Sequence, residues 1–215
     1  MKTWTRPLEA IAGFGLIAVY IWYIRAIWPL AALPLLGVIV LSDAFGDNNL
    51  DVIGISWARF RQNLKRYSRP LAVMVLIVSV FAVRSPSPVR LLGILALYCL
   101  WGVIQQYLLN GFLVNRLRAA RIPGVPVLAG LVFGLLHFPN PFLMGVTFAG
   151  GIVAALVYQR YRDLLLLGVA HGIIGTLLLV SMPDSLTHRF YVGPNCISFC
   201  HEAGHRHDLV QSFTE

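Results

Sequence analysis

Polar side chains are rare in the long apolar stretches of this chain, and most of those that could do chemistry fall in three stretches. One stretch carries Gln105, Gln106 and Asn110, another ends in Phe133-Gly-Leu-Leu-His137, and the last contains His171. A neutral imidazole can take up a proton near neutral pH or bind a metal ion, whereas an amide can only donate and accept hydrogen bonds. The stretches therefore offer histidine chemistry with amide partners, or else hydrogen bonds that only hold helices together.

The positions of these side chains along their stretches predict that they meet. If the stretches are helices, a rise of about 1.5 Å per residue places Gln105, His137 and His171 in one layer near the middle of a bilayer. Gln106 and Asn110 lie four residues apart and so share a helix face. We therefore expect a polar pocket inside a helical bundle.

The C-terminal end is a second place where side chains that bind metals gather. The run His201-Glu-Ala-Gly-His205 matches the His-Glu-x-x-His pattern of zinc proteases, but a short tail supplies neither the third ligand nor the cleft that such a site needs. The remaining interpretations are a divalent metal such as zinc bound without catalysis, a disulfide between Cys196 and Cys200, docking onto a partner, and a mobile end. The candidate metal ligands are Cys196, Cys200, His201, His205 and His207.

The elements that must position these residues are predicted to be membrane-spanning helices. The 215 residues are 58% hydrophobic and 12% charged, about half the charged fraction of a soluble domain. The apolar residues come in long blocks, and a helix of roughly 20 such residues spans a bilayer with every backbone polar group paired. We expect an all-α, polytopic helical membrane bundle of about seven transmembrane helices. The expected segments are Leu8–Trp28, Leu30–Leu41, Pro70–Val83, Leu91–Leu113, Pro126–His137, Phe142–Tyr158 and Leu164–Met182.

The chain is expected to form one membrane domain followed by a tail. Residues 1–182 form the transmembrane domain, with the polar motifs between about 91 and 182, and residues 183–215 form the Cys/His-rich tail. Residues 43–69 mix basic and apolar side chains, which predicts either a basic cytoplasmic loop or a helix lying in the membrane interface.

The basic side chains indicate the orientation. The formal net charge is +8, and Lys and Arg concentrate on the cytoplasmic side of membrane proteins. A cytoplasmic N-terminus and an outward tail, in a bacterial cytoplasmic (inner) membrane, fit this rule best. The lipid bilayer and other membrane proteins are the expected partners, and nucleic acid is not, because no basic face pairs with exposed aromatic side chains. The basic residues then left on the outer side are Arg25, Arg84, Arg90, Arg189 and Arg206.

Taken in order, the three polar motifs resemble those of the CAAX-protease and bacteriocin-processing (CPBP) family of intramembrane proteases. That family carries Glu-Glu-x-x-x-Arg on one span, Phe-x-x-x-His on the next, and His-x-x-x-Asn or a similar motif near the end. The resemblance implies a membrane protease in which a glutamate and a histidine activate water and later polar residues stabilise the oxyanion. The matching segments here are Gln105-Gln106-Tyr-Leu-Leu-Asn110, Phe133-Gly-Leu-Leu-His137 and His171-Gly-Ile-Ile-Gly175.

Four of the matched positions depart from the family pattern, all toward loss of charge or polarity. Gln105 and Gln106 replace the two glutamates, and an amide cannot act as a general base near neutral pH. Asn110 replaces the arginine, which is consistent because no carboxylate is left for a buried cation to neutralise. Gly175 replaces the last polar residue and so removes an oxyanion donor.

Two functions follow from this pattern. The first is a catalytically degenerate protease homologue that acts as an accessory or scaffolding subunit of a membrane assembly. The alternative is an active intramembrane endopeptidase that uses His137 and His171. A small transporter is disfavoured, since the sequence shows no inverted repeat.

Overall fold

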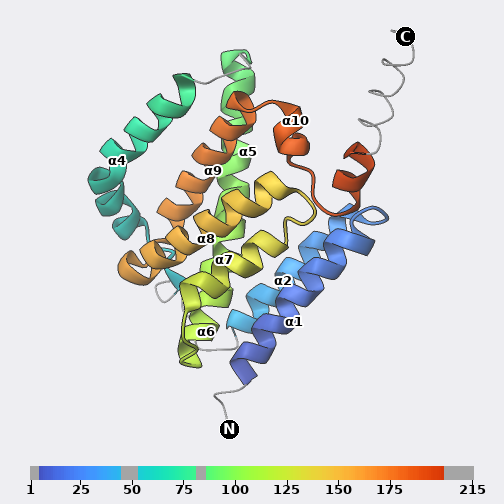
Figure 1. The fold of residues 1–215 in the computed structure, drawn as a ribbon. Helices are drawn as coiled ribbons and strands as arrows, with labels where there is room; N and C mark the ends of the chain where they lie inside the picture. Colours follow the sequence, from blue (N-terminus) through green and yellow to red (C-terminus); the bar gives the residue numbers. More distant parts are fainter. Residues whose placement is uncertain (1–4, 45–52, 81–85, 201–215) are drawn as a thin grey trace.

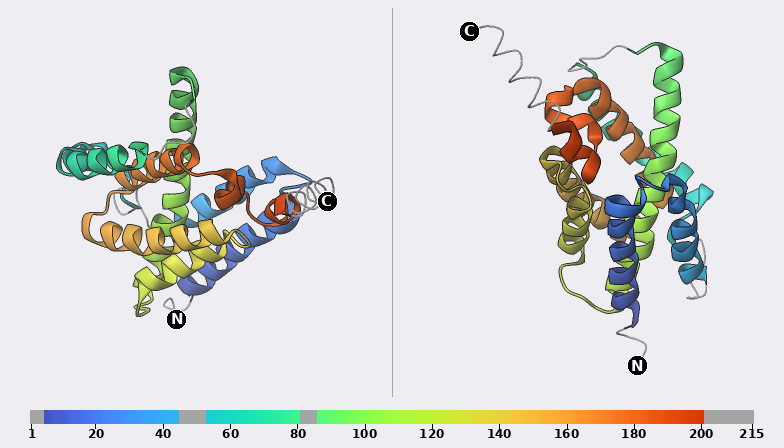
Figure 2. Two further views of the ribbon diagram at one scale, coloured as in Figure 1. Left: turned by 45° about the horizontal axis from the view of Figure 1, so that its top comes forward. Right: turned by 90° about the vertical axis from the view of Figure 1, so that its right-hand side faces the viewer.

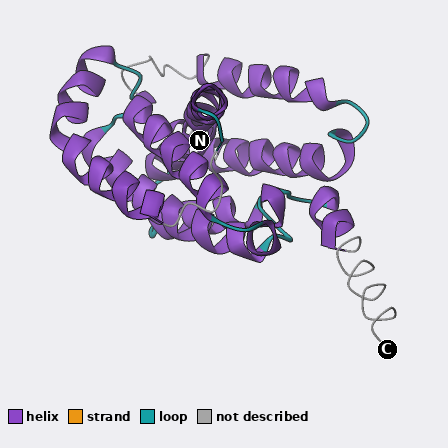
Figure 3. Cartoon of the chain, turned by 90° about the horizontal axis from the view of Figure 1, so that it is seen from above, coloured by secondary structure: helices purple, strands orange, loops and turns teal. Residues whose placement is uncertain are grey.

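A computed structural model gives the fold and describes residues 5–44, 53–80 and 86–200. Within these ranges the chain consists of helices joined by turns and short loops, with no strand (Figure 3). The predicted all-α membrane bundle is therefore confirmed.

Most helices follow the apolar stretches expected from the sequence. Two of them continue into wider π-helical turns, which lengthen α1 and join α5 to α6. The bounds are α1 Thr5–Val19 with a π-helical extension Tyr20–Ile24, a 3-10 turn Pro29–Ala31, α2 Ala32–Ala44, α4 Trp57–Val80, α5 Pro88–Gln106 with a π-helical extension Tyr107–Val114, α6 Asn115–Ala119, α7 Val125–Leu135, α8 Pro141–Tyr161, α9 Leu164–Ser181, α10 Asp184–Thr187 and a 3-10 turn His188–Phe190. Residues 194–200 are also helical.

The helices have the length and surface of an integral membrane protein. Large apolar side chains such as Ile11 and Leu97, each 68% exposed, lie on their outer faces, where lipid would cover them. Four helical stretches in the described part of the chain are long and apolar enough to cross a membrane, and two more apolar helices are shorter. The four are Thr5–Ile24, Pro88–Ala119, Pro141–Tyr161 and Leu164–Ser181, and the two are Pro29–Asp43 and Val125–Leu135.

The expected segment Pro70–Val83 is not a separate helix. Instead, α4 runs without a break from Trp57 to Val80, so its first half carries the basic residues assigned to a loop and its second half carries the apolar ones. The loop-or-interfacial segment 43–69 is thus helical from Trp57 onward, and its residues 45–52 lie outside the described part, as do residues 81–83. The basic side chains on α4 are Arg59, Arg61, Lys65, Arg66 and Arg69.

The helices pack in pairs around the long α5 (Figure 1). The most extensive pairings are α5 with α9 and α7 with α8, and α4 covers the outer side of α9. Helices α1 and α2 lie side by side, and α5 extends beyond its neighbours at one end (Figure 2).

Glycines allow α5 and α9 to approach closely. A Cβ added at Gly102 would fall on the backbone of Gly168, and one at Gly172 would fall on the backbone of Cys99. Small residues of this kind let transmembrane helices pack backbone to backbone. The contact holds the first and last polar motifs next to each other.

The start of α9 is fixed by its capping residue. The Asp163 side chain accepts a hydrogen bond from the backbone N–H of Leu166 at 3.0 Å, and its other oxygen accepts one from the Asn63 amide at 2.9 Å. An N-cap carboxylate satisfies N–H groups that the helix leaves free. The cap therefore sets the depth at which α9 presents His171 and also ties α4 to it.

A buried ion-pair network ties α1 and α2 to α6. Arg116, 4% exposed, contacts the Asp43 carboxylate at 2.6 Å and the Glu9 carboxylate at 3.0 Å. Tyr107 donates to the second oxygen of Asp43 at 2.5 Å, and the guanidinium lies 3.8 Å from the centre of the Phe112 ring. Arg116 is therefore a packed residue of the bundle and not an exposed surface cation.

Candidate functional site

The first polar motif, which contains Gln105, Gln106 and Asn110, lies where α5 changes into its π-helical stretch. Gln106 is the last residue of α5, and the following backbone bonds include one from the N–H of Asn115 to the carbonyl of Asn110, five residues back. π-Helical turns are rare and are frequent at functional sites. Gln106 and Asn110 are 3% and 0% exposed, so their amides must find partners inside the protein.

A chain of hydrogen bonds connects the first motif to the last. The Asn110 Nδ2 donates to Gln106 Oε1 at 2.6 Å, and the Gln106 Nε2 lies 3.1 Å from His171 Nδ1. An amide nitrogen can only donate, so His171 Nδ1 is the acceptor and the ring carries its proton on Nε2. Gln106 thus fixes both the orientation and the tautomer of His171.

The second motif places His137 beside the same group. Its Nδ1 lies 2.7 Å from the backbone carbonyl of Phe133, which can only accept, so the proton is on Nδ1 and Nε2 keeps its lone pair. The Phe133 ring lies 5.0 Å from the His137 ring and 6.0 Å from the His171 ring, measured between centroids. The two histidines therefore lie against one aromatic ring.

Asn140 fixes the turn that follows His137. Its Oδ1 accepts from the N–H of Leu143 and caps α8, and its Nδ2 donates to the carbonyls of Thr187 and Tyr191 at 2.8 and 3.1 Å. The side chain is fully buried. The sequence analysis did not single out Asn140, although an Asn directly before a Pro that starts a helix is a signal for an N-cap.

These residues surround an apolar cavity of about 970 Å³. Gln105, Gln106, His137 and His171 all line it, and the rest of its wall is mostly apolar side chains of α1, α2, α5, α7, α8 and α9. Its described lining residues include no Asp or Glu, and Arg25 is the charged residue among them. The cavity thus combines a small neutral polar group with a wide apolar surface.

The predicted site residues converge, with two refinements. Gln106 contacts His171, whereas Gln105 faces the cavity and has no hydrogen-bond partner among the described residues. At Gly175, a Cβ would lie 2.7 Å from the ring of Tyr98, so that ring fills the space next to the position where the family has a polar residue.

The predicted metal ligands divide into two groups. Cys196 and Cys200 lie in the helical residues 194–200, and His201, His205 and His207 lie outside the described residues. Within the described part, the three-residue group with metal-ligand spacing consists of His188, Cys196 and Cys200, so the central histidines are not part of one. His188 was missed by the sequence analysis, since it is close to the cysteines in space but not in sequence.

Comparison with known proteins supports the family resemblance. The family model described as type II CAAX prenyl endopeptidase Rce1-like matches residues 86–177, a segment that contains all three motifs. No curated protein and no solved structure matches the chain. Over residues 86–177, somewhat under half of the chain, the protein is therefore similar to the CAAX-type membrane proteases of the CPBP family.

Proposed function

We propose that this CPBP homologue is catalytically degenerate and acts as an accessory or scaffolding subunit of a membrane assembly, holding an apolar segment of a partner in its cavity. The observation that carries this proposal is the hydrogen bond between Gln106 and His171, 3.1 Å long, at the place where the family has a glutamate.

Water activation needs a group that accepts a proton. Gln106 prevents this in two ways. The amide itself is not a base, and by donating to His171 Nδ1 it leaves the opposite ring nitrogen protonated. A carboxylate at position 106 would accept from Nδ1–H instead and would free Nε2 to act as the base. In serine proteases, exchanging the aspartate that orients the histidine for its amide produces the wrong tautomer and lowers kcat by about 10⁴-fold.

The cavity supports a binding role. A volume of about 970 Å³ with mostly apolar walls suits a lipid chain or a hydrophobic peptide segment, the kinds of ligand that such pockets hold. The expected partner is therefore another membrane protein that inserts an apolar segment between the helices.

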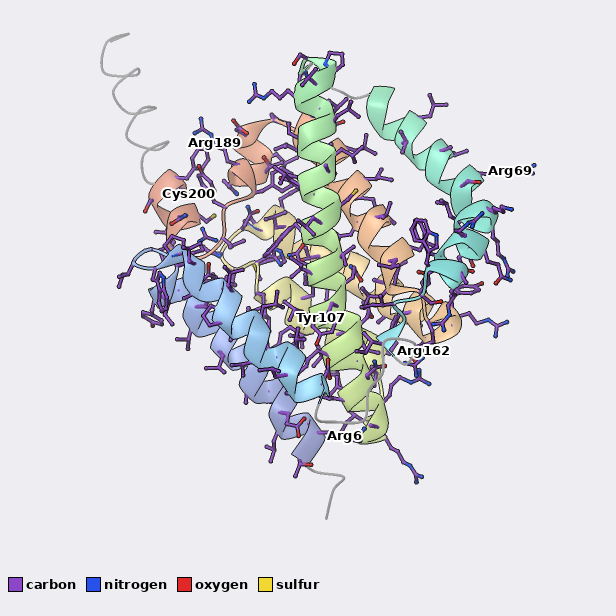
Figure 4. The ribbon with its side chains drawn as sticks, turned by 180° about the vertical axis from the view of Figure 1, so that it is seen from behind. Arg6, Arg69, Tyr107, Arg162, Arg189 and Cys200 are labelled. Atoms are coloured by element: carbon purple, nitrogen blue, oxygen red, sulfur yellow. The ribbon has the colours of Figure 1, made fainter. Side chains whose placement is uncertain are left out.

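The charge distribution supports the orientation that we propose for a bacterial inner membrane. Arg6 and Arg162 lie toward one end of the bundle, Arg189 and Cys200 lie toward the other, and Arg69 on α4 lies nearer the second end (Figure 4). The positive-inside rule places the first end in the cytoplasm, with the N-terminus, and the second end outside.

The second candidate is an endopeptidase that uses His137 and His171. The observation that favours it is the free lone pair on His137 Nε2, which faces no other donor in the described structure and could take a proton from water. The described lining residues of the cavity offer this candidate no carboxylate that could orient a histidine or hold the transferred proton.

The test is purification of the protein from its native membranes in a gentle detergent, followed by mass spectrometry of the intact complex. We expect a fixed stoichiometry with other membrane proteins, and we expect the His137→Ala/His171→Ala variant to keep it. Val146→Trp, which places a bulky ring in the cavity, should release the partner, whereas Leu156→Trp on the outer face of the same helix should not. A protein recovered alone from wild-type membranes would contradict the proposal.

A further inference from the structure

His188, Cys196 and Cys200 form a cluster at the end of the bundle away from the ion pairs of Arg116 with Asp43 and Glu9. One potential ligand atom from each residue lies within 4.8 Å of the others. Two thiolates and an imidazole bound to zinc at about 2.3 Å and 2.0–2.1 Å would be about 3.5–3.8 Å apart in a tetrahedron. Small side-chain movements are therefore enough to close the cluster around an ion.

His188, a member of this cluster, has a ring nitrogen without a hydrogen-bond partner. Its Nδ1 is buried and has no hydrogen-bond partner among the described residues. Buried polar atoms are nearly always paired, so an unpaired one is suited to bind a partner such as a metal ion. The Phe199 ring packs edge-on against the imidazole, with 6.3 Å between centroids, and limits the directions in which it can turn.

The backbone that presents His188 is strained. His188, Arg189 and Phe190 follow one another with φ of 46°, 53° and 58°, a left-handed conformation that residues with a Cβ avoid. Such conformations persist where surrounding contacts enforce them, and they are common at ligand sites. The turn brings the imidazole back over the helix that carries the cysteines.

The two cysteines suit a metal better than a disulfide. They are four residues apart on one helical stretch and are free thiols in the structure. Residues at this spacing have Cβ atoms about 5–6 Å apart, whereas a disulfide needs about 3.5–4.5 Å. Oxidation would therefore deform the helix, while a bridging ion would not.

The cluster lies on a segment that lines part of the cavity. Asn140 donates hydrogen bonds to the carbonyls of Thr187 and Tyr191, one on each side of the His188 turn. The N–H of Gly193 donates to the carbonyl of Phe138, next to His137. Phe190 and Val192 of the same segment line the cavity. An ion bound by the cluster would join the His188 turn to the helical residues 194–200 of this segment.

From this geometry we propose that His188, Cys196 and Cys200 bind a thiophilic divalent cation, zinc by its ligand preference, which holds the turn at His188 against the helical residues 194–200. Thiolate and imidazole donors favour zinc over oxygen-seeking ions such as magnesium or calcium. Water would take the fourth position of the tetrahedron. This site goes beyond the proposed function and does not depend on it.

The first test titrates Co²⁺ into the full-length chain in detergent, after reduction and removal of metals. We expect one ion per chain with a thiolate-to-cobalt charge-transfer band. Cys196→Ser and Cys200→Ser should abolish the band, and Cys99→Ser, which removes the cysteine of α5, should leave it unchanged. His188→Gln should weaken binding at least about tenfold, since even indirect partners of a metal ligand contribute 10- to 100-fold.

The second test uses the wild-type protein and so does not depend on how the variants fold. Zinc should slow alkylation of Cys200 at least about tenfold, since a metal-bound thiolate is held by the ion, and should leave the rate at Cys99 unchanged. Equal alkylation rates with and without zinc, a cobalt band that survives Cys196→Ser, or unchanged affinity in His188→Gln would overturn the assignment.

Discussion

Gln106→Met isolates the hydrogen-bond chain of the site. Met has nearly the same length and helix propensity as Gln but no polar group, so the substitution leaves Asn110 Nδ2 and His171 Nδ1 without their partners. Hydrogen bonds between transmembrane helices contribute about 0.6 kcal/mol on average and about 1.7 at most. Two lost bonds therefore predict a decrease of about 1–3 kcal/mol in the free energy of unfolding.

The assay is reversible unfolding in mixed micelles with increasing SDS, followed by circular dichroism. Gln105→Met is the matched control, because the adjacent amide faces the cavity without a partner among the described residues, and we expect a change of at most about 0.5 kcal/mol. Adding Asn110→Leu to Gln106→Met removes one stranded donor, so the double variant should lose less than the sum of the single variants. Equal stability of the Gln105 and Gln106 variants, or strict additivity, would refute the hydrogen-bond chain.

Three further predictions follow from the same contacts. Gln106→Glu should move the proton of His171 from Nε2 to Nδ1, which ¹⁵N NMR of labelled histidine can detect. A proton found on Nδ1 already in the wild type would contradict this. Arg116→Met should cost about 3–5 kcal/mol in the unfolding assay, because it leaves buried carboxylate oxygens uncompensated, and a loss below about 1 kcal/mol would argue against the network. Gly102→Leu should destabilise by at least about 1–3 kcal/mol by pushing α9 off α5, whereas Gly93→Leu, at an open position on the same helix, should change stability little, and equal effects would disprove the close contact.

The sequence predicted the bundle and the convergence of its polar motifs because both follow from local patterns. Long apolar blocks require helices in lipid, and the rise along those helices placed Gln105, His137 and His171 at similar depths, where all three line the cavity. Sequence alone could not decide which of two adjacent glutamines faces His171. Their side chains point about 100° apart around the helix, so the packing of α5 on α9 makes that choice.

Two further features depended on tertiary structure. The basic residues and Pro70 suggested a boundary between a loop and a helix, yet α4 continues through them, because its packing on α9 outweighs the local signal. His188 joins the cysteines only through a left-handed turn held by Asn140, an arrangement that no short sequence spacing encodes.

The central claim is that the site binds without cleaving, and its most direct test is to identify new protein N-termini in native membranes. Three strains would be compared: wild type, a deletion, and one with His137→Ala/His171→Ala, each checked for expression and folding of the protein. We predict no N-terminus that depends on the two histidines, since Gln106 leaves the site without its carboxylate base. A set of cleavage products present in the wild type and absent from both other strains would contradict the claim and show that the protein is an active endopeptidase.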